Sequence, residues 1–204
     1  MPEFWESNFI EKKEMWGLEA APSAVLTKNF FVEKGIKNVL VPGFGYGRNA
    51  KIFQEAGMAV TGIEISQTAI DLAKKHYGDS MTIHHGSVTD MPFDKNLYDG
   101  IFCYALIHLL DSDERLKLIK DCYHQLQENG YMFFVAISKQ AHTFGQGTFI
   151  SKDRFEIFPG VKMFFYDKES IGSEFGNTGL FQIMEVKENF PFYLIKCRKE
   201  NQPL

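Results

Sequence analysis

Short apolar runs alternate with segments of helical periodicity along the middle of the chain. Apolar and β-branched residues cluster in five runs, at 39–41, 58–63, 81–84, 99–104 and 131–137. Between these runs, apolar residues recur at steps of three and four, which is the spacing of a helix face that packs on a sheet. Strands that alternate with helices form a mostly parallel sheet with helices on both faces. The pattern therefore predicts a doubly wound α/β fold.

Capping residues predict where two of these helices begin. Ser66 precedes one helical segment, and Ser112 precedes a longer one whose apolar residues recur as far as Leu126. A serine just before the first helical turn can accept a hydrogen bond from a free backbone N–H group. Gly130 is expected to end the longer helix, so the next strand should begin at Tyr131.

The N-terminal residues are expected to form two helices. Trp5, Phe9 and Trp16 lie at roughly helical spacing among charged residues, which predicts an amphipathic segment. Pro22 is a favourable first residue for a second helix, and Gly35 is a favourable end. The apolar side expected of this second helix consists of Val25, Leu26, Phe30 and Val32.

The C-terminal third breaks the alternation. A hairpin is predicted around Gly160, and a helix is predicted from about 167 to 175. Two further strands are expected at 181–186 and 192–197. Loops longer than about 12–15 residues commonly carry function, so the segment that contains the hairpin is treated as an insert.

No linker or repeat interrupts the chain, and its 204 residues suit one domain. We therefore predict a single domain over residues 1–204. Its four parts are an N-terminal helical lid or cap, a core, an insert, and a terminal helix with a strand pair, at 1–35, 36–137, 138–166 and 167–204.

Composition narrows the classes of function. The chain is 45% hydrophobic and 24% charged, with a formal net charge of −4. An acidic balance argues against a nucleic-acid partner and against an anionic membrane surface. No apolar run approaches the roughly 18 residues of a membrane span. The first residues are acidic and aromatic, unlike a secretory signal, so a cytoplasmic location is expected.

No metal site is predicted. The three cysteines have no short spacing, which argues against a zinc site and against a disulfide framework. His84 and His85 are adjacent in a predicted strand, so their side chains should face opposite sides of the sheet. They therefore cannot bind one ion together.

A glycine-rich turn follows the first strand. Gly43, Gly45 and Gly47 occupy every second position, a helical segment follows, and the next strand ends on Glu64. Glycines let a backbone turn sharply and approach a ligand without a Cβ atom in the way. A carboxylate about 20 residues further on can accept hydrogen bonds from a ribose diol. This arrangement predicts a site for a nucleoside-bearing cofactor.

The identity of the cofactor depends on position 48. A dinucleotide fingerprint has its third glycine there, where the helix faces a pyrophosphate, but this chain has Arg48. An arginine in the first helical turn is unfavourable for the helix dipole unless it meets an anion or solvent. A cofactor with a carboxylate and no pyrophosphate suits the loop better. S-adenosylmethionine (SAM) has that character.

Residues 39–47, Val-Leu-Val-Pro-Gly-Phe-Gly-Tyr-Gly, resemble the first motif of the class I SAM-dependent methyltransferases. The resemblance implies a Rossmann-like sheet of seven strands, mostly parallel, with an antiparallel last strand. It also implies that the chain transfers a methyl group from SAM to an acceptor.

The same resemblance assigns roles to individual residues. Glu64 should bind the ribose, Ile65 should pack on the adenine, and the Cys103 carbonyl should accept from the methionine ammonium group. Ser87 replaces an acid that many members use to bind adenine, and Asp90 is an alternative for that contact. The implied cofactor-binding set is Pro42, Gly43, Gly45, Gly47, Arg48, Glu64, Ile65, Ser87, Val88 and Cys103.

The acceptor side is less defined. Tyr104 and His108 follow the fourth strand, where family members often carry a histidine near the transferring methyl group, so they are the candidate catalytic residues. His108 is equally well explained as a structural residue at a helix start. With Trp5, Phe9 and Trp16 from the N-terminal segment, these two residues form the predicted acceptor pocket.

Two short stretches concern the acceptor. Arg48-Asn49-Ala50 resembles the tellurite-resistance methyltransferases, and residues 60–66 resemble the thiopurine and thiol methyltransferases. Both resemblances imply a small acceptor, such as a thiol or another soft nucleophile. The Asp/Asn-Pro-Pro-Tyr/Phe motif of nucleobase amino methylation is missing after the fourth strand. The alternatives are a SAM-binding protein without catalysis and a nicotinamide-dependent dehydrogenase.

Overall fold

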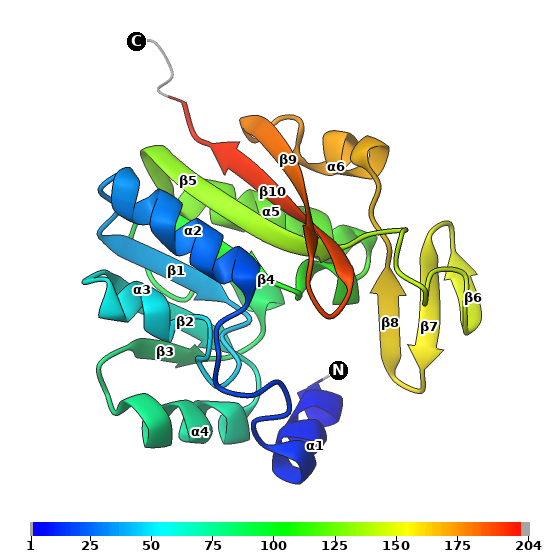
Figure 1. The fold of residues 1–204 in the computed structure, drawn as a ribbon, viewed down its shortest axis with the longest axis horizontal. Helices are drawn as coiled ribbons and strands as arrows, with labels where there is room; N and C mark the ends of the chain where they lie inside the picture. The colour runs from blue at the N-terminus through cyan, green and yellow to red at the C-terminus, as the bar shows by residue number, and fades with distance from the viewer. Residues whose placement is uncertain (1, 201–204) are drawn as a thin grey trace.

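A seven-stranded sheet runs through the centre of the protein, with strand order β3-β2-β1-β4-β5-β10-β9 (Figure 1). The structure is a computed structural model that describes residues 2–200. In chain order the elements are α1 (Pro2–Lys12), α2 (Pro22–Glu33), β1 (Asn38–Pro42), α3 (Lys51–Glu55), β2 (Ala59–Glu64), α4 (Gln67–Tyr77), β3 (Thr82–His85), η1 (Val88–Asp90), β4 (Tyr98–Tyr104), η2 (Ile107–Leu109), α5 (Ser112–Gln125), β5 (Leu126–Ile137), β6 (Thr148–Ser151), β7 (Arg154–Phe158), β8 (Val161–Phe164), α6 (Lys168–Phe175), β9 (Leu180–Lys187) and β10 (Pro191–Arg198).

The central strands are parallel. β1 pairs with β2 on one side and with β4 on the other, and β2 and β4 pair in parallel with β3 and β5. The last strand along the chain, β10, is antiparallel to both of its neighbours, β5 and β9. The predicted Rossmann-like sheet of seven strands, mostly parallel and with an antiparallel last strand, is therefore confirmed.

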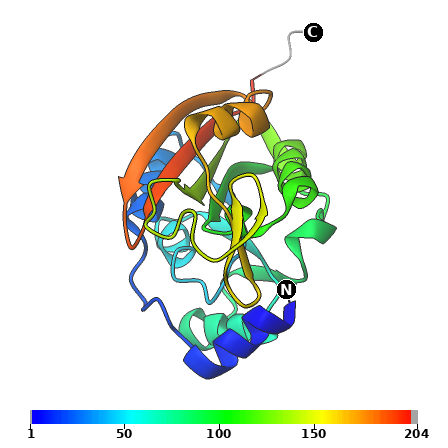
Figure 2. The ribbon, with the colours of Figure 1, turned by 90° about the vertical axis from the view of Figure 1, so that its right-hand side faces the viewer.

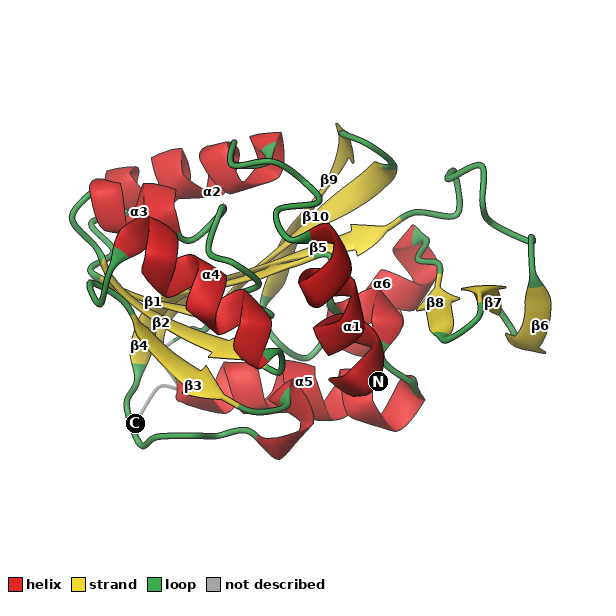
Figure 3. Ribbon diagram, turned by 90° about the horizontal axis from the view of Figure 1, so that it is seen from below, coloured by secondary structure: helices red, strands yellow, loops and turns green. Residues whose placement is uncertain are grey.

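Helices cover both faces of the sheet, as a doubly wound fold requires (Figure 3). α2, α3 and α4 lie on one face, and α5 and α6 lie on the other. On the first face, the buried ring of Phe31 packs against Phe53 and Phe133. On the second, Phe134 packs against Phe175. Neighbouring residues 133 and 134 thus serve opposite faces, so β5 is apolar throughout its second half.

The packing of α2 differs from the prediction. Its predicted apolar side is largely in solvent: Val25, Leu26 and Val32 are all exposed. Phe31 is fully buried instead, close enough to the backbone of Gly100 that a Cβ there would lie 2.7 Å from its ring. Small side chains complete the buried side and let the helix approach the sheet; they are Ser23, Ala24 and Thr27.

The predicted boundaries of two helices have different outcomes. Ser66 caps α4 as predicted, accepting a hydrogen bond from the Ala69 N–H at 3.1 Å. The cap of α5 is Asp111, which forms a capping box with Glu114, so the prediction of Ser112 as cap was wrong. The reciprocal box satisfies two free N–H groups where a serine hydroxyl would satisfy one.

The end of α5 was also predicted wrongly. The helix ends at Gln125, and β5 begins directly at Leu126 rather than at Tyr131. Leu126 is paired with Tyr98 of β4, so the extended backbone finds a partner strand five residues before the expected start. Asn129 then adopts a positive φ of 64° ahead of Gly130. The pairing of β5 with β4 shifts register in this stretch, between Tyr98 and Gly100, so the irregularity lies in the strand rather than in the helix.

The insert forms a second, three-stranded antiparallel sheet, β6-β7-β8, beyond the carboxyl ends of the central strands (Figure 2). The predicted hairpin is confirmed, with Gly160 at φ +83° between β7 and β8. Lys139 anchors the insert, because its ammonium group bridges Asp153 at 2.7 Å and Asp167 at 2.5 Å. The third strand, β6, was not predicted.

The N-terminal helix α1 packs against α4. Glu6 accepts hydrogen bonds from the hydroxyls of Ser66 at 2.6 Å and Thr68 at 2.5 Å, at the start of α4. Phe4 lies beside the hairpin of the insert, since a Cβ at Gly160 would be 3.2 Å from its ring. The N-terminal segment therefore meets the insert. No helix within residues 2–200 is long and apolar enough to cross a membrane.

Candidate functional site

The strand order reverses between β1 and β4, which makes their carboxyl ends the switch point of the sheet. The chain leaves β1 toward α3 on one face and leaves β4 toward α5 on the other. In open α/β sheets, ligands bind in the crevice that this divergence opens. The glycine loop after Pro42 and the segment that begins at Tyr104 border this crevice.

The three glycines of the loop have different roles. All have left-handed backbones, with φ of +72°, +58° and +82° at Gly43, Gly45 and Gly47. A Cβ at Gly43 would lie 3.0 Å from Leu106, and one at Gly47 would lie 3.0 Å from Phe44. A Cβ at Gly45 would have no atom of the described residues within 4 Å. Only Gly45 therefore faces open space into which a ligand could approach, whereas the other two permit close packing.

Glu64 lies at the end of β2, directly beside this open position. It is 6% exposed, and its carboxylate accepts hydrogen bonds from the N–H groups of Gly45 at 2.6 Å, Ile65 at 2.9 Å and Ser66 at 2.9 Å. Burial raises the pKa of Glu64, while these three hydrogen bonds favour the charged form. A carboxylate has about four acceptor positions, so capacity remains for one ligand hydroxyl.

The remaining predicted cofactor residues lie along the same edge. Ser87 caps η1, and its hydroxyl is hydrogen-bonded to the Thr89 hydroxyl, with the two oxygens 2.7 Å apart. Val88 is buried, and Ile65 follows Glu64. The thiol of Cys103 is fully buried, and burial raises its pKa. A catalytic role for that thiol is not indicated.

Arg48 points to the N-terminal segment. Its guanidinium donates to the carbonyls of Trp16 at 3.3 Å and Glu19 at 3.1 Å. The same group lies 5.5 Å from the centre of the Tyr104 ring, a cation–π distance. These contacts satisfy the arginine without a cofactor anion, so its role in cofactor binding stays a prediction.

Tyr46 was not singled out from the sequence. Its buried hydroxyl accepts from the Trp16 N–H at 3.1 Å and donates to the Gly17 carbonyl at 2.7 Å. Its ring stacks on Trp16, with centroids 6.2 Å apart and planes at 12°. An aromatic residue between two glycines of a ligand loop was the signal available in the sequence.

Tyr104 has a partner that is distant in the sequence. Its hydroxyl donates to Glu188 Oε2 at 2.6 Å, and Glu188 Oε1 accepts from the Ser23 N–H at 2.7 Å. Glu188 lies in the turn between β9 and β10, beside the start of α2. It was not predicted, and no local motif marks it, because the contact spans 84 residues.

His108 is a poor candidate for a base. Its side chain is buried, and its Nδ1 accepts the Ile137 N–H at 3.3 Å. Burial lowers the pKa of His108 to about 3. The imidazole is therefore neutral and too weakly basic to hold a proton near neutral pH, which supports the structural interpretation of this residue.

Aromatic rings line the same region from the β9–β10 turn to the insert. Phe192 lies 6.2 Å from both Tyr104 and His108, centroid to centroid. Phe190 is next to Phe192 at 6.3 Å, and His142 of the insert stacks on Phe190 at 5.5 Å with planes at 14°. This aromatic wall, residues 104, 190, 192 and 142, suits a flat apolar ligand.

Comparison with known proteins agrees with this geometry. Residues 40–134 match the family described as methyltransferase domain, a stretch that includes the glycine loop, Glu64 and Tyr104. A 1,6-didemethyltoxoflavin-N1-methyltransferase of Burkholderia thailandensis superposes with a TM-score of 0.76 at 13% identity, over 98% of this chain and 87% of that one. The fold is that of the SAM-dependent methyltransferases.

Two further proteins place this methyltransferase fold among its relatives. The magnesium protoporphyrin IX methyltransferase of Synechocystis PCC 6803 superposes with a TM-score of 0.71 at 12% identity, over 98% of this chain and 97% of that one. The ubiquinone biosynthesis O-methyltransferase of Actinobacillus pleuropneumoniae is 31% identical over 112 residues, which are 50% of this chain and 47% of that protein. The chain spans about half the length of the curated relatives it matches.

Within the methyltransferase fold, the predicted pocket residues separate into two groups. Trp5, Phe9 and Trp16 gather around Tyr46, and Phe9 is buried while Trp16 is 43% exposed. They cover the outer side of the glycine loop. Tyr104 and His108 belong to the aromatic wall instead, and Arg48 links the two groups through Trp16 and Tyr104. The five residues therefore lie in two neighbouring groups, and a shared acceptor pocket stays a prediction.

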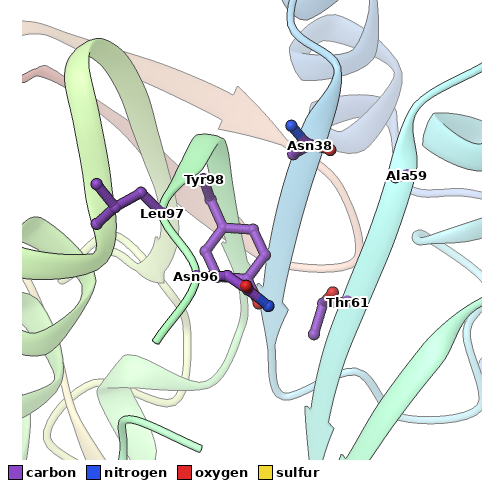
Figure 4. Close-up of a pocket in the computed structure, with 6 residues that line it drawn as sticks. All are labelled: Asn38, Ala59, Thr61, Asn96, Leu97 and Tyr98. Atoms are coloured by element: carbon purple, nitrogen blue, oxygen red, sulfur yellow. The ribbon is translucent and has the colours of Figure 1, made fainter. Parts of the chain in front are cut away.

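A cleft of about 310 Å³ opens at the opposite end of the methyltransferase sheet (Figure 4). It lies at the amino ends of β1, β2 and β4, and its lining residues are Asn38, Ala59, Thr61, Asn96, Leu97 and Tyr98. This position is a strand length away from Glu64 and the glycine loop, so the cleft is not the candidate site. Among the described residues, no group of histidine, cysteine and acidic side chains could hold a metal ion.

Proposed function

We propose that the protein is an enzyme that transfers the methyl group of SAM to a hydroxyl group on a small planar aromatic acceptor. The observation that carries the proposal is the pairing of two features at one switch point. Gly45 and Glu64 offer open space and a carboxylate on one side, and the aromatic wall with Tyr104 lies on the other.

The residues present fit the cofactor. Gly45 leaves room for a ligand against the backbone, and Glu64 keeps an acceptor position for a ribose hydroxyl. Ile65 would pack on the adenine, the Val88 N–H would bind its edge, and the Cys103 carbonyl would accept from the ammonium group. SAM supplies a methyl group on a positively charged sulfur, which is already activated toward a nucleophile. The protein then has to align the two reactants and exclude water.

The aromatic wall and the relatives support a planar acceptor. The four rings of the wall form an apolar border for a flat ligand. The two charged side chains nearby, Arg48 and Glu188, are already engaged with Tyr104 and with backbone groups. One relative is named for O-methylation in ubiquinone biosynthesis, and one solved structure contains 1,6-didemethyltoxoflavin with S-adenosylhomocysteine. Both names describe those proteins, and they motivate an aromatic acceptor here.

A thiol acceptor is the second candidate. The low pKa of His108 removes the imidazole as a base, and a thiolate needs no base to react. The proposed resemblance to the tellurite-resistance and thiopurine groups points the same way. A nicotinamide-dependent dehydrogenase has no support from the methyltransferase matches. The expected cytoplasmic location and lack of a nucleic-acid partner stay predictions.

The test combines binding with turnover. Purified protein and SAM are incubated with catechols, simple phenols, aromatic amines, alkyl thiols and selenite, and release of S-adenosylhomocysteine is measured. We expect SAM binding by calorimetry and turnover with catechols. Turnover with thiols alone would replace the acceptor class by the second candidate. SAM binding without turnover of any acceptor would support the SAM-binding protein without catalysis.

A further inference from the structure

We infer that Tyr104 and Glu188 form the pair that removes the proton from the acceptor hydroxyl, with Tyr104 as the residue that touches the acceptor. The inference rests on the proposed function and names the path of the proton within it. Glu188 acts through Tyr104 and is therefore a positioning and proton-holding residue.

The location of Tyr104 is the first argument. It is the last residue of β4, at the switch point, and it is half-buried, so its ring is reachable from the crevice. Arg48, from the end of the glycine loop, lies over one face of the ring at 5.5 Å. Phe192 lies on another side at 6.2 Å. The phenol is therefore placed between Arg48 of the cofactor loop and Phe192 of the aromatic wall.

The direction of its hydrogen bond is the second argument. The Tyr104 hydroxyl donates its proton to Glu188 over 2.6 Å, and one lone pair of the phenol oxygen faces the Arg48 guanidinium. The second lone pair is the position that can accept from an acceptor hydroxyl. Glu188 is held in this orientation by the Ser23 N–H at the start of α2 and by the turn hydrogen bond from its own N–H to Phe190. A carboxylate with both oxygens engaged is well oriented to receive a proton.

The electrostatics are consistent with this direction. Burial and the hydrogen bond to Glu188 raise the pKa of Tyr104, so the phenol stays protonated at neutral pH. The Arg48 guanidinium opposes part of this rise, and it would stabilise negative charge that develops on the phenol oxygen during transfer. Tyr104 therefore passes a proton on rather than holding it.

Other groups near the switch point are already committed. His108 uses Nδ1 for the Ile137 N–H, the Cys103 thiol is fully buried, and the Glu64 carboxylate accepts three backbone N–H groups. His108 would have to release the Ile137 N–H, and the Cys103 thiol would have to become exposed, before either could accept a proton. The remaining acceptor position of Glu64 is assigned to the ribose hydroxyl. The Tyr104–Glu188 pair needs no such change.

A lone pair of the acceptor oxygen forms the bond to the methyl carbon, and the carbon–sulfur bond of SAM breaks with its electron pair on sulfur. The acceptor proton moves to the Tyr104 oxygen as the Tyr104 proton moves to Glu188. The products are the methyl ether, S-adenosylhomocysteine and protonated Glu188, which returns its proton to solvent.

The experiment compares two acceptors that differ in whether a proton must be removed. Catechol is protonated at neutral pH, whereas the nitro group of 4-nitrocatechol leaves one of its hydroxyls ionised. We expect Tyr104→Phe and Glu188→Gln to lower kcat for catechol by about 10²- to 10⁴-fold, the usual contribution of acid–base catalysis. With 4-nitrocatechol the loss should stay below about tenfold.

A structural role would lower both rates alike, and such a result would overturn the inference. Glu185→Gln is the matched control, because Glu185 is exposed on β9 only three residues from Glu188. It should leave both rates unchanged. If the parent protein binds SAM but methylates neither catechol, the proposed acceptor class fails, and the inference fails with it.

A second measurement needs no acceptor. In protein labelled with carbon-13 at the tyrosine ring carbon that bears oxygen, Tyr104→Phe identifies the Tyr104 resonance. Glu188→Gln should move this resonance and lower the pH at which it titrates, because the neighbouring negative charge is gone. An unmoved resonance would show that the two side chains are not in contact in solution.

Discussion

The link between Tyr46 and the N-terminal segment gives a prediction whose size follows from the structure. Tyr46→Phe removes one oxygen atom and keeps the ring that stacks on Trp16. The lost hydroxyl leaves the Trp16 N–H and the Gly17 carbonyl without their partner. The perturbation is therefore confined to two hydrogen bonds that attach residues 16–17 to the glycine loop.

The magnitude is the sum of those two bonds. A hydrogen bond of this kind contributes about 0.5–1.5 kcal/mol, so the pair should contribute about 1–3 kcal/mol to docking of the segment. Since about 1.4 kcal/mol corresponds to a factor of ten, opening should become about 5- to 140-fold more frequent. Arg48 still donates to the carbonyls of Trp16 and Glu19, so complete release is not expected.

Hydrogen exchange measures this opening directly. The amides of Trp16 and of α1 should exchange faster by the stated factor, while those of β4 and β5 stay protected. Tyr77→Phe is the matched control, because the Tyr77 hydroxyl is buried near the same loop and has no hydrogen-bond partner within residues 2–200. Unchanged exchange at Trp16 in Tyr46→Phe would show that the segment is held by other contacts. The segment would then be a fixed cap rather than a lid.

Three further predictions concern binding and stability. Glu64→Ala should weaken SAM binding, measured by calorimetry, by about 1.5–3 kcal/mol, which is the contribution of a hydrogen bond to a charged group. Equal affinity of variant and parent would show that the ribose does not bind at Glu64. In the parent protein Glu174 binds the buried guanidinium of Arg115 at 2.8 Å. Glu174→Ala leaves that charge without its partner and should lower the free energy of unfolding, measured in urea, by about 3–5 kcal/mol. A loss below about 1 kcal/mol would contradict a buried pair. Lys139 and the Ser170 amide lower the pKa of Asp167 to about 2. Asp167 therefore stabilises the fold above its unfolded pKa of about 3.9, and this stabilisation is lost as the pH falls toward 2. Asp167→Asn should reduce the loss of unfolding free energy between about pH 4 and pH 2. An unchanged loss in this range would show that other groups cause it.

Local patterns determined the core of this protein. Apolar runs separated by helical periodicity predicted the parallel strands, because side chains that repeat in this way can be buried only between helix layers. The glycine loop and Glu64 were identified from spacing alone, since a tight turn and the acid that follows the next strand act within one βαβ unit. Ser66 was identified as a cap for the same reason: its hydrogen bond to Ala69 spans three residues.

Tertiary structure decided the rest. Tyr104 and Glu188 are 84 residues apart, and they meet only because β10 inserts between β5 and β9. This pairing brings the β9–β10 turn to the carboxyl end of β5, within reach of the Tyr104 side chain on the next strand. The low pKa of His108 is a consequence of burial, which no local pattern reports. The buried side of α2 follows from the shape of the sheet beneath it, where Gly100 makes room for the Phe31 ring. Composition and spacing specify interactions within one structural unit, whereas contacts between distant units depend on how the whole chain packs.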